Sequence, residues 1–202
     1  SLDLKIDYTY PAITTPPELA PTYLLGQSAT FTLGATDGLS GMDRVWADLN
    51  VVNPDGSYRG PGVAVESGVP VTLDTLGTNT LRIFAQDMAG NLGMRLLIFD
   101  VIYDFGEFQT PLISGGIYRL GRTIPIKFQL FDAAGNAISA ATPTLSFWKM
   151  SNGIFGYEYV ETPFIEGDTG GEFRYDPESQ QYVYNLKTKG MSTGTWKLRV
   201  TL

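Results

Sequence analysis

The chain has 202 residues, of which 17% are charged, with a formal net charge of −7 and neither Cys nor His. The negative charge opposes nucleic-acid binding, which needs a cationic surface, and no apolar run reaches the ~20 residues of a transmembrane helix. Without Cys and His, the commonest catalytic bases, thiol nucleophiles and zinc ligands are excluded within this sequence.

Alternation of apolar and polar residues predicts strands throughout the first half of the chain. The predicted strands cover residues 29–35, 44–52, 80–85 and 92–102, and turn signals follow at residues 36–38, 54–57 and 87–91. Frequent Gly, Pro, Tyr and Phe agree with many short strands joined by tight turns. We expect Trp46, and Trp196 in the second half, to serve the cores as large residues on central strands.

The alternation of apolar and polar residues stops at residues 103–111 and then resumes. This interruption predicts a domain boundary near residue 105. Further strands are predicted at residues 123–131, 144–148, 173–175, 181–186 and 194–202. The same order of features occurs near residue 25 and again near residue 120. Two apolar residues and a Gly come first, a strand follows, and an Asp-rich turn ends the unit. The sequence therefore predicts an all-β protein with two tandem immunoglobulin-like β-sandwich domains, residues 1–104 and 105–202.

Residues 106–202 resemble the bacterial PxKF module, which is named for the sequence carried here by Pro125, Lys127 and Phe128. The flanking residues 120–123 and 132–136, and the later segments 181–186 and 194–198, are also similar to that family. Such modules continue with a polar turn and a final strand, so the resemblance implies that the second sandwich lacks its last strand. The first half is similar to bacterial Ig-like repeats through residues 35–41 and 85–91.

Both families occur as appendages of large secreted or surface-attached proteins, including hydrolases, and neither is known as a catalytic unit. The resemblance implies a non-catalytic structural or adhesive accessory module that acts as a spacer, in an extracellular or cell-surface location. Its expected partners are neighbouring domains of the same polypeptide, with a glycan or cell-wall component as a further candidate. We expect a monomer that belongs to a longer chain, with signal and anchor outside this sequence.

Acidic residues at the predicted strand ends suggest a calcium site. The ends of strands 29–35 and 80–85 should meet at one pole of a sandwich, which brings Asp37 and Asp87 together, with Asp43 and Asn91 nearby. Oxygen ligands of this kind suit Ca²⁺. A corresponding loop in the second half carries Asp132 and Asn136. The alternative is that these side chains only hydrogen-bond their own turns, with Gly90 and Gly135 at positive φ.

Aromatic residues crowd residues 148–164, and exposed rings of this kind stack on sugars. Trp148, Tyr157 and Tyr159 are the candidate ligand-binding residues, which makes a carbohydrate-binding module that targets an attached hydrolase the alternative function. The other interpretation is a strand followed by a hairpin, with either Phe147 or Trp148 in the core. The carboxylates at 158, 161, 166 and 168 could form a glycosidase pair, but a solvated loop explains them better, and we expect no catalytic residues.

Overall fold

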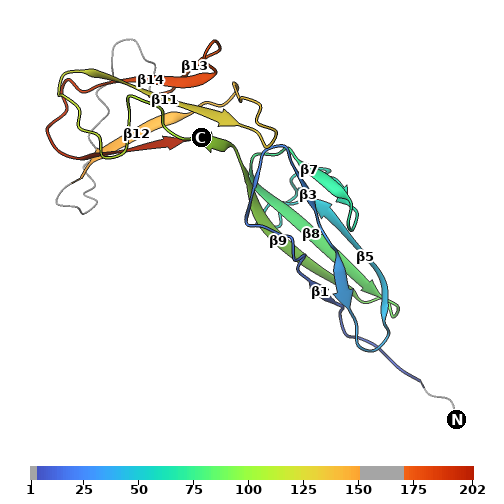
Figure 1. Ribbon diagram of the computed structural model, residues 1–202. Coiled ribbons are helices and arrows are strands. Elements are labelled where there is room, and N and C mark those ends of the chain that lie inside the picture. The colour runs from blue at the N-terminus through green and yellow to red at the C-terminus, as the bar shows by residue number, and fades with distance from the viewer. Residues whose placement is uncertain (1–3, 151–170) are drawn as a thin grey trace. The chain divides into compact units, whose positions relative to one another are not determined.

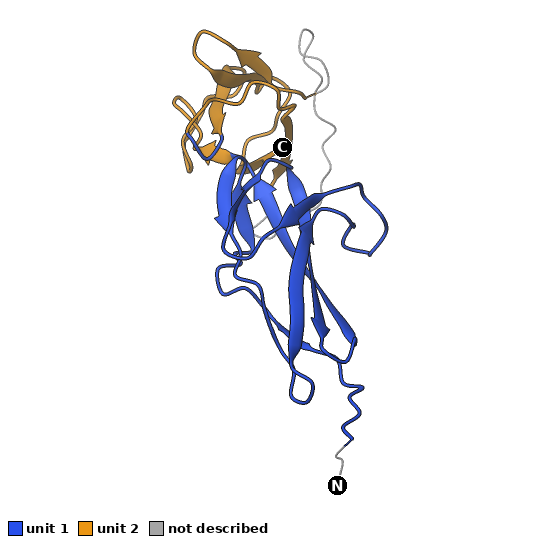
Figure 2. Ribbon diagram, turned by 90° about the vertical axis from the view of Figure 1, so that its right-hand side faces the viewer, with its two compact units in different colours: residues 1–103, 132–134 blue, residues 104–131, 135–202 orange. Residues whose placement is uncertain are grey.

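The computed structural model describes residues 4–150 and 171–202, and this part of the chain contains strands and no helix. The chain divides into two compact units, residues 1–103 with 132–134 and residues 104–131 with 135–202 (Figure 2). The all-β prediction is confirmed. The division at Tyr103 falls where the alternation of the sequence breaks.

The first unit packs a five-stranded sheet against two strand pairs (Figure 1). The order in the large sheet is β2 (Thr22–Leu24), β9 (Leu92–Ile102), β8 (Gly77–Asp87), β5 (Met42–Leu49) and β6 (Val63–Val65). The strand pairs are β3 (Gln27–Thr30) with β7 (Pro70–Leu73), and β1 (Ala12–Thr14) with β4 (Gly34–Thr36).

Alternation along the strands builds the core between these layers. On β8, Leu81, Ile83 and Ala85 are fully buried, while the residues between them face outward. Three aromatic rings, Tyr23, Phe31 and Phe99, meet at centroid distances of 5.1 to 6.3 Å. Such large buried side chains supply most of the hydrophobic stabilisation of a small sandwich.

A parallel strand pair joins the two ends of the first unit. Thr22, Tyr23 and Leu24 of β2 lie beside Asp100, Val101 and Ile102 of β9, whereas the other strand pairs in the described residues are antiparallel. The N–H of Asp100 donates to the carbonyl of Pro21 at 2.9 Å, and the N–H of Leu25 donates to the carbonyl of Ile102 at 2.8 Å. The pairing therefore holds an early strand directly against the last one.

The second unit contains a four-stranded and a two-stranded sheet. The larger has the order β10 (Asp104–Gly106), β11 (Thr123–Phe131), β14 (Gln181–Lys187) and β13 (Arg174–Asp176), and the smaller pairs β12 (Thr144–Lys149) with β15 (Trp196–Thr201). Phe128 has no exposed surface and contacts the rings of Phe173 at 4.9 Å and Tyr182 at 5.3 Å. The Pro-x-Lys-Phe sequence thus lies on a central strand whose Phe is a core residue.

One predicted strand of the first half is two strands in the structure. Residues 29–35 were expected to be continuous, but β3 ends at Thr30 and pairs with β7, whereas β4 begins at Gly34 and pairs with β1. Between them the N–H of Leu33 donates to Ser67 Oγ at 2.9 Å instead of to a neighbouring strand. The chain changes partner strands here, which apolar periodicity alone does not reveal.

Candidate metal centre

The loop between β4 and β5 is organised around the Asp37 carboxylate. Its Oδ2 accepts hydrogen bonds from the backbone N–H groups of Leu39 at 2.9 Å, Ser40 at 2.8 Å and Gly41 at 2.9 Å. An Asp in this position replaces the missing backbone partners of a tight turn. These donors, chiefly Leu39 and Gly41, lower the pKa of Asp37, because they stabilise the charged form.

Asp87 closes the hairpin between β8 and β9. It is 1% exposed, and its carboxylate accepts from the backbone N–H of Asn91 and from Asn91 Nδ2, both at 2.8 Å. Gly90, at φ +91°, supplies the left-handed residue that this turn requires. Asn91 thus presents its amide nitrogen to Asp87, which makes it a donor to the carboxylate.

Asp7 completes the cluster, although no pattern in the sequence singles it out. It lies in the N-terminal segment ahead of β1, where Thr9 donates to its Oδ1 from the backbone N–H at 3.0 Å and from Oγ1 at 2.7 Å. The N–H of Ser40 donates to its Oδ2 at 3.0 Å. Hydrogen bonds from Ser40 and Thr9 hold the pKa of Asp7 far below its usual range.

The three carboxylates of Asp7, Asp37 and Asp87 each place an oxygen within 4.8 Å of the other two. The two ion pairs in the described residues, Arg44 with Asp43 and Arg82 with Asp48, lie outside this group. Asp7 raises the pKa of Asp37 by charge repulsion, against the hydrogen bonds that lower it. Three hard oxygen ligands without a basic partner form an arrangement that suits a divalent cation such as Ca²⁺.

The structure separates the other predicted metal ligands from this group. Asp43 is exposed and lies 3.9 Å from Arg44. In the loop after β11, which was predicted as a second metal-binding loop, Asp132 accepts a hydrogen bond from the N–H of Ala134 at 2.9 Å. Asp132 belongs to no group of three acidic side chains among the described residues, whereas Asp7, Asp37 and Asp87 form one.

The predicted aromatic site lies partly outside the described residues. Tyr157 and Tyr159 fall in the segment 151–170, while Trp148 lies on β12 beside Phe147. Phe147 is buried and Trp148 is half-buried, which agrees with the expectation that one of them belongs to the core. Trp46 was expected in the core of the first unit, and this is wrong: it lies half-buried on the outer face of β5 and stacks on Phe84 of β8 at 5.3 Å.

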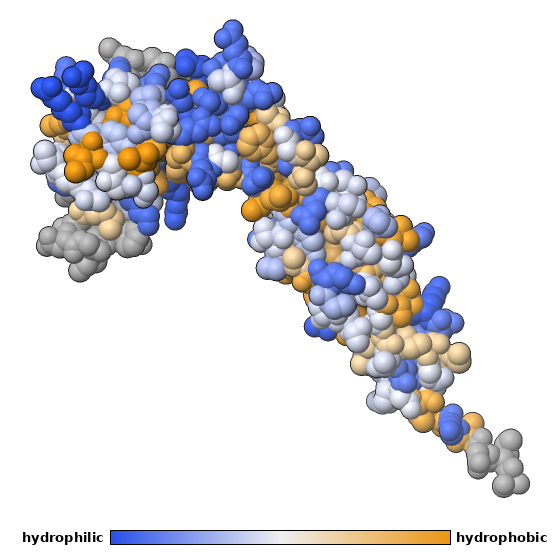
Figure 3. Space-filling view, in the orientation of Figure 1, coloured by the Kyte–Doolittle hydropathy of each residue, from blue (hydrophilic) through white to orange (hydrophobic). Residues whose placement is uncertain are grey.

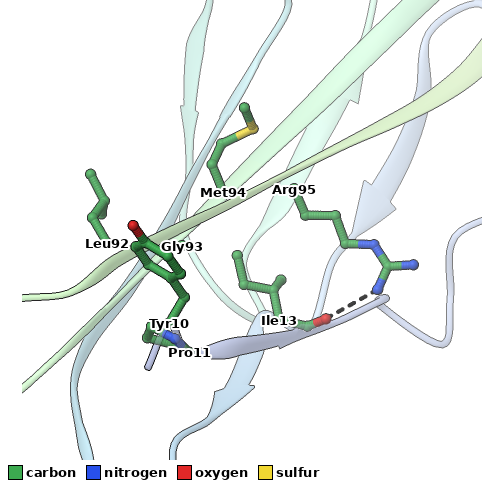
Figure 4. Close-up of a pocket in the computed structure, with 7 residues that line it drawn as sticks. All are labelled: Tyr10, Pro11, Ile13, Leu92, Gly93, Met94 and Arg95. Atoms are coloured by element: carbon green, nitrogen blue, oxygen red, sulfur yellow. Dashed lines mark hydrogen bonds between the residues drawn. The ribbon is translucent and has the colours of Figure 1, made fainter. Parts of the chain in front are cut away.

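An open depression lies beside the N-terminal segment of the first unit (Figure 4). Its lining consists of Tyr10, Pro11 and Ile13 on one side and residues 92–95 of β9 on the other. The guanidinium of Arg95 donates to the carbonyl of Ile13 at 3.0 Å. The lining contains no carboxylate, so this depression does not provide the acidic pair that glycoside hydrolysis requires.

The lowered pKa values make the first unit sensitive to acid. Because Asp7 and Asp37 are more acidic in the folded chain than in the unfolded one, the stability they contribute is present above pH ~4 and is lost as the pH falls through their folded pKa values. We expect Tm to decrease steadily below pH 4 and the Asp7→Asn variant to show a shallower decrease. Glu66→Gln, an exposed substitution on the same unit, is the control, and an unchanged slope in Asp7→Asn would contradict this account.

Comparisons with known proteins add little to this geometry. The chain matches no protein-family model and no curated protein sequence. Among solved structures it is similar to a β-glucuronidase of Parabacteroides merdae, at 14% identity and a TM-score of 0.28 over 71% of this chain and 18% of that protein. A likeness this weak carries no argument about activity. Within the described ranges, no helix is long and apolar enough to cross a membrane.

Proposed function

We propose that the chain is a non-catalytic structural module, two Ig-like sandwiches that act as a spacer in a larger secreted or cell-surface protein. The parallel pairing of β2 with β9 is the observation that supports this most directly. Tension that reaches β2 from its N-terminal side, beyond β1 and its pairing with β4, and β9 from its C-terminal side pulls these two strands in opposite directions. The hydrogen bonds between them are then loaded together along the strands and do not open one after another.

The surface of the first unit also suits a spacer. In Figure 3 hydrophobic residues on its visible face form separate patches among hydrophilic ones. Dispersed patches give no single broad apolar surface on this face for stable association with another protein. The partners that we propose are the neighbouring domains of the same polypeptide, with the module itself as a monomer.

Calcium binding by Asp7, Asp37 and Asp87 is a second part of the proposal. The buried position of Asp87 supports it, since a carboxylate removed from water is stabilised strongly by a nearby cation. Asp7 precedes β1, whereas Asp37 and Asp87 belong to the tip of the sandwich. A cation at this point would fasten the N-terminal segment to the body of the unit and stiffen the spacer.

Single-molecule force measurements test the spacer role. The chain has no Cys, so pairs of introduced thiols define where the force is applied. Handles at Thr22→Cys, the exposed first residue of β2, and Ile102→Cys load β2 and β9 in shear, whereas handles at Leu76→Cys and Ile102→Cys peel β8 from β9. We expect the first pair to unfold the unit at a clearly higher force. Equal forces for the two directions would contradict a tension-resistant spacer.

A further inference from the structure

The small sheet of the second unit has two chemically different faces. On β12, Leu145 and Phe147 are buried, so Thr144, Ser146 and Trp148 lie on the opposite face. Their cross-strand neighbours on β15 are Thr201, Arg199 and Lys197 respectively. We define these six residues as the β12–β15 outer face. It combines an indole ring, two cations and three hydroxyl groups.

Trp148 differs from the other tryptophans in what its ring contacts. The ring of Trp46 has the guanidinium of Arg44 4.7 Å from its centre and also stacks on the ring of Phe84. Trp196 contacts Phe147 edge to face and donates its indole N–H to the carbonyl of Ser192 at 3.0 Å.

The ring of Trp148 contacts the guanidinium of Arg199 at 5.6 Å. Its indole N–H has no hydrogen-bond partner in the described part of the chain, and no buried polar side-chain atom there is left unsatisfied. The indole N–H is therefore accessible to solvent and able to donate to a ligand.

The charge of this face is opposite to that of the whole protein. Its six residues include Lys197 and Arg199, although the chain carries a net charge of −7. One exposed carboxylate, that of Glu172, lies at the end of β12 away from Trp148, where its backbone bridges Thr144. The exposed Arg199 beside Trp148 favours a ligand that is anionic, offers a weakly apolar surface to the indole, and accepts hydrogen bonds from hydroxyl and N–H donors.

We propose that the β12–β15 outer face binds an acidic polysaccharide, with uronic acid residues as the recognised unit. The C–H face of a pyranose ring packs on Trp148, and its carboxylate pairs with the guanidinium of Arg199, which favours planar oxygen pairs. Ser146, directly opposite Arg199, offers a hydroxyl to the sugar ring. This binding role goes beyond the spacer function and can fail independently of it.

A purely structural role for the same residues makes different predictions. Cross-strand pairs of Trp with Lys or Arg stabilise a sheet by cation–π contact without any ligand. In that case substitution of Trp148 would change the stability of the second unit and nothing else. Binding measurements therefore separate the two roles.

The test is titration calorimetry of the 202-residue chain with polygalacturonate, a neutral galactan and polyglutamate at low salt. We expect binding to polygalacturonate alone, weakened by added NaCl because exposed charges are screened. Trp148→Ala and Arg199→Gln should each reduce the affinity roughly tenfold, which corresponds to the ~1.4 kcal/mol of a tenfold change. Trp46→Ala is the matched control, because it removes an indole of the first unit that is already covered by Arg44 and Phe84.

Four results would overturn the proposal. Absence of binding at millimolar uronate, equal binding to the neutral galactan, or equal binding to polyglutamate would each exclude recognition of an acidic sugar. Unchanged affinity in both Trp148→Ala and Arg199→Gln would exclude this face. If Trp148→Ala does not fold, Trp148→Phe together with Arg199→Gln keeps the test decisive, since the first retains a ring and the second removes only the charge.

Discussion

Ca²⁺ in the millimolar range should raise the Tm of the first unit by about 5–10 °C. A ligand at ten times its Kd stabilises the folded state by about 1.4 kcal/mol, and each kcal/mol shifts the Tm of a unit of ~100 residues by roughly 4–8 °C. The physical reason is that a divalent cation offsets the repulsion among Asp7, Asp37 and Asp87, whose oxygens lie within 4.8 Å of one another. Differential scanning calorimetry with Ca²⁺ and with EDTA measures the shift.

Substitutions in the cluster test whether the Tm shift arises from Ca²⁺ bound at this site. Asp37→Asn should abolish the response to Ca²⁺, because it removes one negative charge from the group. Asp74→Asn, an exposed aspartate elsewhere on the same unit, should leave the response intact. A Tm that does not change at millimolar Ca²⁺ would exclude the site, and an equal response in both variants would place the ion elsewhere.

Phe31→Ala should destabilise the first unit by about 3–5 kcal/mol, the usual cost of removing a buried aromatic ring. Phe31 has no exposed surface and contacts both Tyr23 and Phe99. Since a domain of this size is stable by only ~5–15 kcal/mol, the loss should separate its unfolding transition from that of the second unit. Urea unfolding followed by tryptophan fluorescence resolves this, because Trp46 is the tryptophan of the first unit.

The matching variant in the second unit is Phe128→Ala. It should move the transition reported by Trp148 and Trp196 and leave the one reported by Trp46 in place. If either substitution shifted both transitions equally, the two units would unfold as one cooperative body, and the proposed division into two independent sandwiches would be wrong.

Sequence periodicity predicted the strands that pair regularly over their length. The bounds expected for β9 and β11, 92–102 and 123–131, are those of the structure. β11 alternates along its length, and β9 follows a recognisable turn and pairs with β8 in one continuous register. The break between β3 and β4 was missed because Ala29 and Phe31 continue the alternation while the chain changes partners. Trp46 was wrongly predicted to lie in the core because its large side chain suggested burial. Its position between Val45 and Ala47 in an alternating strand already indicated that it faces the other side of the sheet.

The candidate metal centre, too, could be predicted only in part from the sequence. Asp37 and Asp87 could be expected to meet, since each follows a strand that ends at the same pole, and the structure brings them together. Asp7 could not be expected, because it lies in no predicted strand or turn and reaches the cluster through hydrogen bonds from Ser40 and Thr9. Contacts between an irregular segment and a distant loop leave no periodic trace in a sequence.

The parallel pairing of β2 with β9 also constrains how the first unit is made. The partner of Thr22 is Asp100, so this contact joins residues separated by most of the unit. Contacts over such long separations slow folding, because the intervening chain must be ordered before they form. During synthesis from the N-terminus, β2 therefore has to wait without its partner until residue 102 has left the ribosome. Over that interval its unpaired edge is open to incorrect pairing.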